Sequence, residues 1–222
     1  MTRPDLSYDI NAVSSLVSRA NLKTVKDLNR IVSKAKESRN IIRFVKMGDI
    51  RSLSLKVYAD ASFGNQEEGT RSTGGRVILL ENESGGIVNI ASWKTKKISR
   101  VCRSVKGAET RAMEDALDEA VHLARLIQEI YTGKIDLRNP GQLPVVAVTD
   151  CKSLWESIHN TRQCEEKLLR NSIAGLKDLI SLGMVKDVKW VSTDKMLADC
   201  MTKKGKKADW LMKVSSENIL AI

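Results

Sequence analysis

Leu53-Ser54-Leu55-Lys56-Val57-Tyr58-Ala59-Asp60 alternates apolar and polar side chains and ends in an acid. This period of two is typical of a β-strand with one buried face. Two more strands are predicted directly behind it, at residues 76–80 and 87–93. Because only short turns separate the three strands, the sequence predicts an antiparallel meander.

The second half of the chain alternates helices with strands. A long helix is predicted at about residues 108–131, where apolar side chains recur every three or four positions. The nearly continuous apolar run at 143–149 is typical of a central strand that is buried on both faces. The remaining elements are predicted as helices at 152–158 and 165–182, a strand at 185–192 and a final helix from about Asp194, broken near Gly205. The order βββ-α-β-α-β-α predicts an α/β fold.

Three parts are expected along the chain. Residues 1–50 show apolar stripes at helical spacing and form a helical appendage, with a short β-branched strand at 41–45. Residues 51–204 form the main domain, and residues 205–222 form a helical tail.

Composition narrows the class of protein. A hydrophobic content of 42% in 222 residues supports a folded core. No apolar run approaches the roughly 18 to 20 residues that span a membrane, and no secretory signal is visible at the N-terminus. The four cysteines form no C-x-x-C pair, which argues against a zinc site and for free thiols in a reducing compartment. The net charge of +10 favours polyanionic partners, although a solvated basic surface has the same composition.

Four carboxylates are the candidate catalytic groups. Asp60 and Asp150 each end a predicted strand, Glu109 lies in the first turn of the long helix, and Asp199 follows the last strand. Phosphodiester hydrolysis with two metal ions needs several carboxylates around one point. Each acid taken alone is equally explained as a turn former, a helix cap, a dipole partner or a surface charge. If the strands that precede Asp60 and Asp150 are parallel neighbours, their carboxylates meet.

A basic segment precedes Glu109. Residues 94–106 hold six basic side chains and no acidic one. A phosphate backbone would be attracted there, beside Glu109, although a solvated basic loop is the simpler interpretation.

Several longer stretches resemble one family. They are Tyr58-Ala59-Asp60-Ala61-Ser62-Phe63-Gly64-Asn65, Ser72-Thr73-Gly74-Gly75, Ala91-Ser92-Trp93-Lys94-Thr95-Lys96-Lys97, Ser104 with Ala108-Glu109-Thr110, Thr149-Asp150-Cys151-Lys152-Ser153, and Val191-Ser192-Thr193-Asp194 with Leu197-Ala198-Asp199 and Met201-Thr202-Lys203. Together they span about residues 53–204 and resemble the ribonuclease H domain of copia-type retrotransposon polyproteins. Residues 2–50 resemble the segment that follows the polymerase palm, but no Tyr-x-Asp-Asp motif is present.

The resemblance implies a ribonuclease H-like fold, which is a five-stranded mixed sheet flanked by helices. It implies cutting of RNA in RNA–DNA hybrids with two Mg²⁺ ions, for which Mn²⁺ can substitute. Asp60, Glu109, Asp150 and Asp199 would be the catalytic metal ligands. The expected substrate-binding residues are Ser62, Ser72, Thr73, Lys94, Lys96, Lys97, Arg100, Arg103 and Ser104.

Expected partners are an RNA–DNA hybrid and the polymerase part of the same polyprotein, with no membrane and no small-molecule cofactor. The expected location is the cytoplasm, virus-like particles or the nucleus.

The sequence departs from the patterns of related ribonucleases H at two places. Residues 184–198 contain no histidine, whereas cellular ribonucleases H often have one before the last Asp. Gly107 stands where many copia-type sequences carry a second Glu. Two alternatives stay open: an inactive ribonuclease H-like module that binds nucleic acid or acts as a scaffold, and an integrase or resolvase of the same superfold. Glu109 on the first long helix argues against an integrase.

Overall fold

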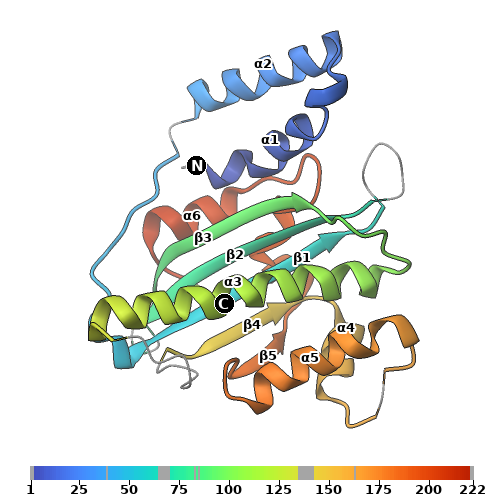
Figure 1. The fold of residues 1–222 in the computed structure, drawn as a ribbon. Helices are drawn as coiled ribbons and strands as arrows, with labels where there is room; N and C mark the ends of the chain where they lie inside the picture. The colour runs from blue at the N-terminus through green and yellow to red at the C-terminus, as the bar shows by residue number, and fades with distance from the viewer. Residues whose placement is uncertain are drawn as a thin grey trace.

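A five-stranded mixed sheet forms the centre of the molecule (Figure 1). The computed structural model describes residues 3–38, 40–64, 71–82, 84, 86–134, 143–162 and 164–220, so Thr2 and Asn65 of the matching stretches lie outside it. The sheet order is β3-β2-β1-β4-β5. The strands are β1 (Leu53–Ser62), β2 (Thr73–Asn82), β3 (Ile87–Lys97), β4 (Val145–Thr149) and β5 (Asp187–Trp190).

The directions of the strands match the prediction. β1, β2 and β3 form the antiparallel meander, whereas β4 pairs parallel to β1 and β5 pairs parallel to β4. The predicted fold class, an α/β ribonuclease H-like fold with a five-stranded mixed sheet and flanking helices, is confirmed.

Each face of the sheet has its own core. The face that carries Leu55 and Val57 packs against α3 (Val105–Thr132), α4 (Lys152–His159) and α5 (Arg170–Ser181). Tyr58 points to the other face, which is covered by the 3-10 segment η6 (Leu197–Met201) and by α6 (Asp209–Glu217). Successive side chains of β1 therefore contribute to the hydrophobic cores on the two faces of the sheet, as a period of two requires.

The long helix α3 begins earlier than its apolar pattern predicts. Ser104 is its N-cap, and the Ser104 hydroxyl accepts a hydrogen bond from the Gly107 amide at 3.0 Å. This cap starts the helix at Val105 and places Glu109 one turn inside it. Gly133 ends the helix in the left-handed region at φ 66°. None of the helices in the described ranges is both long and apolar enough to cross a membrane.

Two local predictions differ from the structure. The helix expected from Asp194 is interrupted near Gly205 (φ 73°) as predicted, but its first part consists of the 3-10 segments η5 (Thr193–Lys195) and η6 in place of an α-helix. The helix expected at 165–182 begins with the 3-10 turn η4 (Lys167–Leu169), and α5 itself starts at Arg170.

The N-terminal segment forms a helical hairpin beside β3. It consists of η1 (Pro4–Leu6), α1 (Ser7–Ser14), η2 (Val17–Arg19) and α2 (Leu22–Glu37), and α1 contacts β3 directly (Figure 1). A third 3-10 turn, η3 (Ile50–Ser52), leads into β1.

The strand predicted at residues 41–45 is wrong. Those residues are all described and are extended without joining the sheet. The backbone of Val45 bonds to a side chain and not to a neighbouring strand. The side-chain amide of Asn89 donates to the Val45 carbonyl at 2.8 Å, and the Val45 backbone amide donates to Asn89 Oδ1 at 3.0 Å. β-branched composition indicates an extended backbone, but it does not show whether a sheet edge is available.

The residue after α6 also contacts the segment at 41–45 and strand β3. Asn218 follows the helix in the left-handed conformation at φ 59°. Its side-chain amide lies 2.9 Å from the carbonyl oxygens of Arg43 and Val88 and from Asn89 Oδ1. The Asn218 contacts therefore join the N-terminal segment, the edge strand and the C-terminal helix at one buried point, which we call the Asn218 clasp.

Candidate metal centre

Three carboxylates meet at one end of the sheet. The register of β1 and β4 pairs Tyr58 with Val148, so the acids that follow these residues leave the sheet at the same end. The first turns of α3 bring Glu109 to the same place. One carboxylate oxygen from each of Asp60, Glu109 and Asp150 lies within 4.8 Å of the other two. The parallel pairing on which the sequence prediction depended is therefore present.

Burial gives this cluster its electrostatic character. Asp60 is 1% exposed and Glu109 is 5% exposed. Loss of hydration raises the pKa of Asp60 to about 6, although the Thr202 hydroxyl and Lys203 oppose the shift. Loss of hydration, followed by the charges of Asp60 and Asp150, raises the pKa of Glu109 to about 9.

The donor set of the cluster fits a hard divalent cation. Glu109 Oε2 is buried and has no hydrogen-bond partner among the described residues. A buried carboxylate oxygen without a partner is costly, and a cation in contact with it would remove that cost. Carboxylate oxygens are the ligands that Mg²⁺ and Mn²⁺ prefer. The three-acid cluster is thus chemically suited to hold such an ion.

Asp199 lies next to this cluster, but its carboxylate contacts lysine side chains. It is buried on η6 and forms an ion pair with Lys203. Its Oδ2 is 2.6 Å from Lys206 Nζ, a charge contact that lacks the alignment of a hydrogen bond. Asp199 is not a member of the three-acid group. The structure therefore brings three of the four predicted acids together and pairs the fourth with lysines.

Thr202 links the two parts of the site. It is fully buried, and its hydroxyl donates a hydrogen bond to Asp60 Oδ2 and lies 3.3 Å from the Asp199 carbonyl oxygen. Thr202 thus fixes one oxygen of Asp60 against the segment that carries Asp199.

A glycine lets that segment approach the sheet. A Cβ at Gly75 would lie 2.5 Å from Met201 Cβ and 2.8 Å from Thr202 Cγ2, closer than real carbon contacts. The Thr95 hydroxyl donates to the Met201 carbonyl at 2.9 Å from the neighbouring strand. Gly75 and Thr95 together seat η6 on β2 and β3, and Asp199 is aimed inward as a result.

The predicted substrate-binding residues fall into groups. Ser62, Thr73 and Lys97 are paired in register across β1, β2 and β3 at the end of the sheet that carries Asp60. Thr73 and Ser72 are buried, and the Ser72 hydroxyl accepts from the Gly64 amide at 3.2 Å. Ser62 and Lys97 are half-buried and are the more accessible members of this row.

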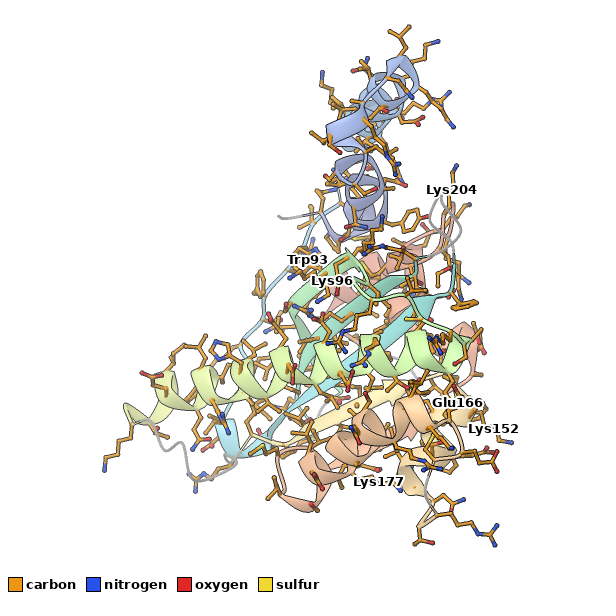
Figure 2. All side chains as sticks on the ribbon, turned by 45° about the vertical axis from the view of Figure 1, so that its right-hand side comes forward. Trp93, Lys96, Lys152, Glu166, Lys177 and Lys204 are labelled. Atoms are coloured by element: carbon orange, nitrogen blue, oxygen red, sulfur yellow. The ribbon has the colours of Figure 1, made fainter. Side chains whose placement is uncertain are left out.

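The basic residues of β3 point in two directions. Lys94 and Lys96 lie on the α3 side with Arg100, around a cleft of about 290 Å³, and Lys96 forms an ion pair with Asp115 (Figure 2). Lys97 points to the other side, toward α1 and α2. The predicted basic segment is therefore divided between two surfaces.

Ser104 and Arg103 lie at the N-terminus of α3. Arg103 is exposed. The Ser104 hydroxyl donates to Glu166 Oε2 at 2.8 Å, so an acidic side chain lies at this helix end (Figure 2).

Other contributors were not foreseen. Arg76 is buried inside an apolar strand and pairs with Asp115 at 2.6 Å and with Glu119 at 3.1 Å. Thr202 and Lys203 belong to one of the stretches that resemble the family. The four-residue step from Asp199 to Lys203 is the one signal that could have indicated their pairing.

Comparisons place the chain among known proteins. No protein-family model matches it. It is 27% identical over 202 residues to a retrovirus-related Pol polyprotein from transposon RE1 of Arabidopsis thaliana, a match that covers 91% of this chain and 13% of the polyprotein. It is 30% identical over 124 residues to secreted RxLR effector protein 161 of Plasmopara viticola, with 55% of this chain and 81% of that protein covered. Among solved structures, LC11-RNase H1 isolated from compost is similar over 72% of this chain and 98% of its own, at 14% identity and a TM-score of 0.47.

Proposed function

Since this chain is similar over 91% of its length to retrovirus-related Pol polyproteins from transposons, we propose that it hydrolyses the RNA strand of RNA–DNA hybrids in a two-metal reaction. It would act as the ribonuclease H part of a reverse transcriptase, with the polymerase part of the same polyprotein as its partner. The chain spans 13% of the length of those relatives, so this activity is a proposal for the chain itself.

The convergence of three carboxylates, two of which are buried, carries the proposal. Asp60, Glu109 and Asp150 would hold the ions, and Asp199 would join them once Lys203 and Lys206 turn away from it. Two Mg²⁺ ions, or Mn²⁺ in their place, would supply activation of water and stabilisation of the leaving oxygen.

The remaining residues would bind and orient the substrate. Lys94 and Arg100 are exposed on the α3 side of the site and would attract phosphates. Ser62 lies two residues beyond Asp60 at the sheet end, where a hydroxyl could contact an RNA 2′-hydroxyl. Thr202 would keep the Asp60 carboxylate oriented while the substrate binds.

Cleavage of a labelled RNA–DNA hybrid tests the proposal. The wild-type chain should cut the RNA strand with Mg²⁺ or Mn²⁺ and should leave duplex DNA and duplex RNA intact. Asp60→Asn should reduce the rate by at least about 100-fold, because an amide cannot replace a carboxylate toward the ions.

The matched control is Asp194→Asn. Asp194 is an exposed acid five positions before Asp199, and its change should leave the rate of cutting within about twofold of wild type. Metal-independent cutting, or full activity of Asp60→Asn, would overturn the assignment.

One observation favours a second candidate, a nucleic-acid-binding module without catalysis. Lys203 and Lys206 place two ammonium groups against Asp199, where an ion would otherwise compete for that carboxylate. Hybrid binding that weakens with salt, without cutting under any divalent ion, would support this candidate over the enzyme.

A further inference from the structure

A second basic cleft lies away from the carboxylates, between the N-terminal hairpin and the sheet. It has a volume of about 380 Å³, and Val13, Leu16 and Ile31 contribute its apolar part. Six basic side chains line it: Arg19, Lys23, Arg30, Lys34, Lys97 and Lys204. The first four belong to the hairpin, whereas Lys97 ends β3 and Lys204 follows η6. The cleft is therefore built jointly by the hairpin and the ribonuclease H-like domain.

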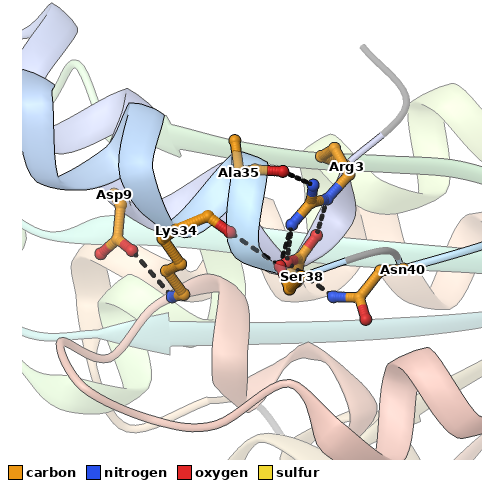
Figure 3. A network of polar contacts seen from close by, with 7 residues as sticks. Arg3, Asp9, Lys34, Ala35, Ser38 and Asn40 are labelled. Atoms are coloured by element: carbon orange, nitrogen blue, oxygen red, sulfur yellow. Dashed lines mark hydrogen bonds and ion pairs between the residues drawn. The ribbon is translucent and has the colours of Figure 1, made fainter.

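Contacts at both ends of the hairpin order its two helices, so the part of the cleft that they line is preformed. At the open end, Arg3 donates to the Ala35 carbonyl at 2.9 Å and to the Ser38 hydroxyl at 2.6 Å, while it pairs with Asp5 (Figure 3). At the turn, Asn21 and Thr24 form a reciprocal capping box that starts α2. A binding surface with its backbone already ordered loses little entropy when a ligand binds.

The charge of the cleft favours an anion. Among the described residues, the acidic side chains of the lining are Asp9 and Asp27, so its six basic residues outnumber its acids by four. Both acids are already paired within the hairpin: Asp9 with Lys34 at 3.1 Å (Figure 3) and Asp27 with Arg30 at 2.9 Å. The balance of charge on the described lining would attract an elongated polyanion.

The cleft continues the surface of the candidate metal centre. Ser62 pairs with Thr73 and Thr73 pairs with Lys97, so Lys97 lies two strand spacings, about 10 Å, from the strand that carries Asp60. Lys204 directly follows Lys203, the residue that pairs with Asp199. Figure 2 shows Lys204 between the sheet and the hairpin. One nucleic-acid strand could therefore contact both surfaces without leaving the protein.

We propose that this cleft binds the phosphate backbone of the nucleic acid whose other part lies at the carboxylates. The inference deepens the proposed function and rests on it for the nature of the ligand. The hairpin then acts as a substrate clamp, and its contacts are independent of base sequence because they involve phosphates alone.

Salt-dependent binding of a fluorescent RNA–DNA hybrid, measured by anisotropy on the full chain without divalent ions, tests the clamp. The variant Arg19→Gln/Lys23→Gln removes two charges from the cleft. Its affinity should fall about tenfold at moderate salt, and the slope of log K against log salt should become shallower by about 2.

The matched control is Lys26→Gln/Lys36→Gln. These two lysines are exposed on α2, which also carries Lys23, and they do not line the cleft. The control should retain the wild-type affinity and slope. All four positions are exposed, so both double variants should melt within a few degrees of wild type.

The outcomes separate the clamp from the enzyme. If wild type cuts the hybrid but both double variants bind it equally well, the clamp is wrong and the enzyme stands. If wild type binds with the expected loss in the cleft variant but never cuts, the clamp stands and the enzyme is wrong. If wild type does not bind the hybrid, the clamp is wrong.

Discussion

Thr202 orients the carboxylate of Asp60 through a hydrogen bond. Its hydroxyl is the donor to Asp60 Oδ2, and its backbone belongs to the segment that carries Asp199. Thr202→Val keeps the shape and removes the donor. We expect Mn²⁺ affinity, measured by calorimetry, to fall about 10- to 100-fold, as when other hydrogen-bond partners of metal ligands are removed.

Thr202→Ser keeps the hydroxyl and should recover most of the Mn²⁺ affinity. Thr193→Val, at an exposed position of η5, is the control for the loss of a threonine hydroxyl. Wild-type affinity in Thr202→Val would show that Thr202 only packs against β2.

Glu109 makes the stability of the metal-free protein depend on pH. Its pKa is raised from 4.5 to about 9 on folding, so between these values the folded chain holds a proton that the unfolded chain has lost. Stability must then fall as the pH rises through this window. Glu109→Gln removes the titrating group, and we expect it to raise the free energy of unfolding by at least about 2 kcal/mol at pH 8.

Urea unfolding in the presence of a chelator would measure this gain at several pH values. The gain should shrink toward pH 4, where Glu109 is protonated in both states. Glu129→Gln, on the same helix but outside the cluster, should show no such trend. A gain that does not change with pH would contradict the linkage.

Among the elements, the segment 40–47, β3 and α6 depend on one another through the Asn218 clasp. Asn218→Gly preserves the left-handed backbone at φ 59° but removes the side-chain contacts to Arg43, Val88 and Asn89. Because buried carbonyls would then lack a donor, we expect a loss of about 2 to 4 kcal/mol in the free energy of unfolding.

Thermal unfolding of Asn218→Gly beside Asn218→Asp would test the clasp. Asp retains the size of the side chain but cannot donate, so both variants should lose stability. An unchanged melting temperature in both would show that the clasp contributes little.

Strands with a clear pattern of hydrophobic residues could be predicted from the sequence. Segments whose conformation depends on side-chain contacts to distant residues could not. The alternation in 53–60 and the apolar run at 143–149 predict β1 and β4, because burial of one or both faces leaves a clear pattern. The extended segment at 41–45 has the composition of a strand, yet its partners are Asn89 and Asn218, which are far away in the chain. No local pattern encodes such a partner.

For the whole molecule, the sheet topology and the meeting of three acids were accessible from the sequence. Strand order followed from short connections and from the family resemblance, and the parallel pairing of β1 with β4 then brought Asp60 beside Asp150. The burial of Asp199 was not accessible, because it depends on the close approach of Gly75 to Met201. The basic cleft was hidden for a similar reason: its lysines come from elements far apart in the chain.

The clasp also sets an order of events while the protein is being made. β3 is an edge strand, and the Val88 amide donates to the carbonyl of Asn218, which is synthesised 130 residues later. At about 5 to 20 residues per second, a nascent chain holds the Val88 end of this edge without its Asn218 partner for roughly 6 to 26 s. Neighbouring ribosomes on one message hold such edges close together, where strands can pair between chains. We expect the charges of Lys94, Lys96 and Lys97 to oppose such pairing until α6 is made.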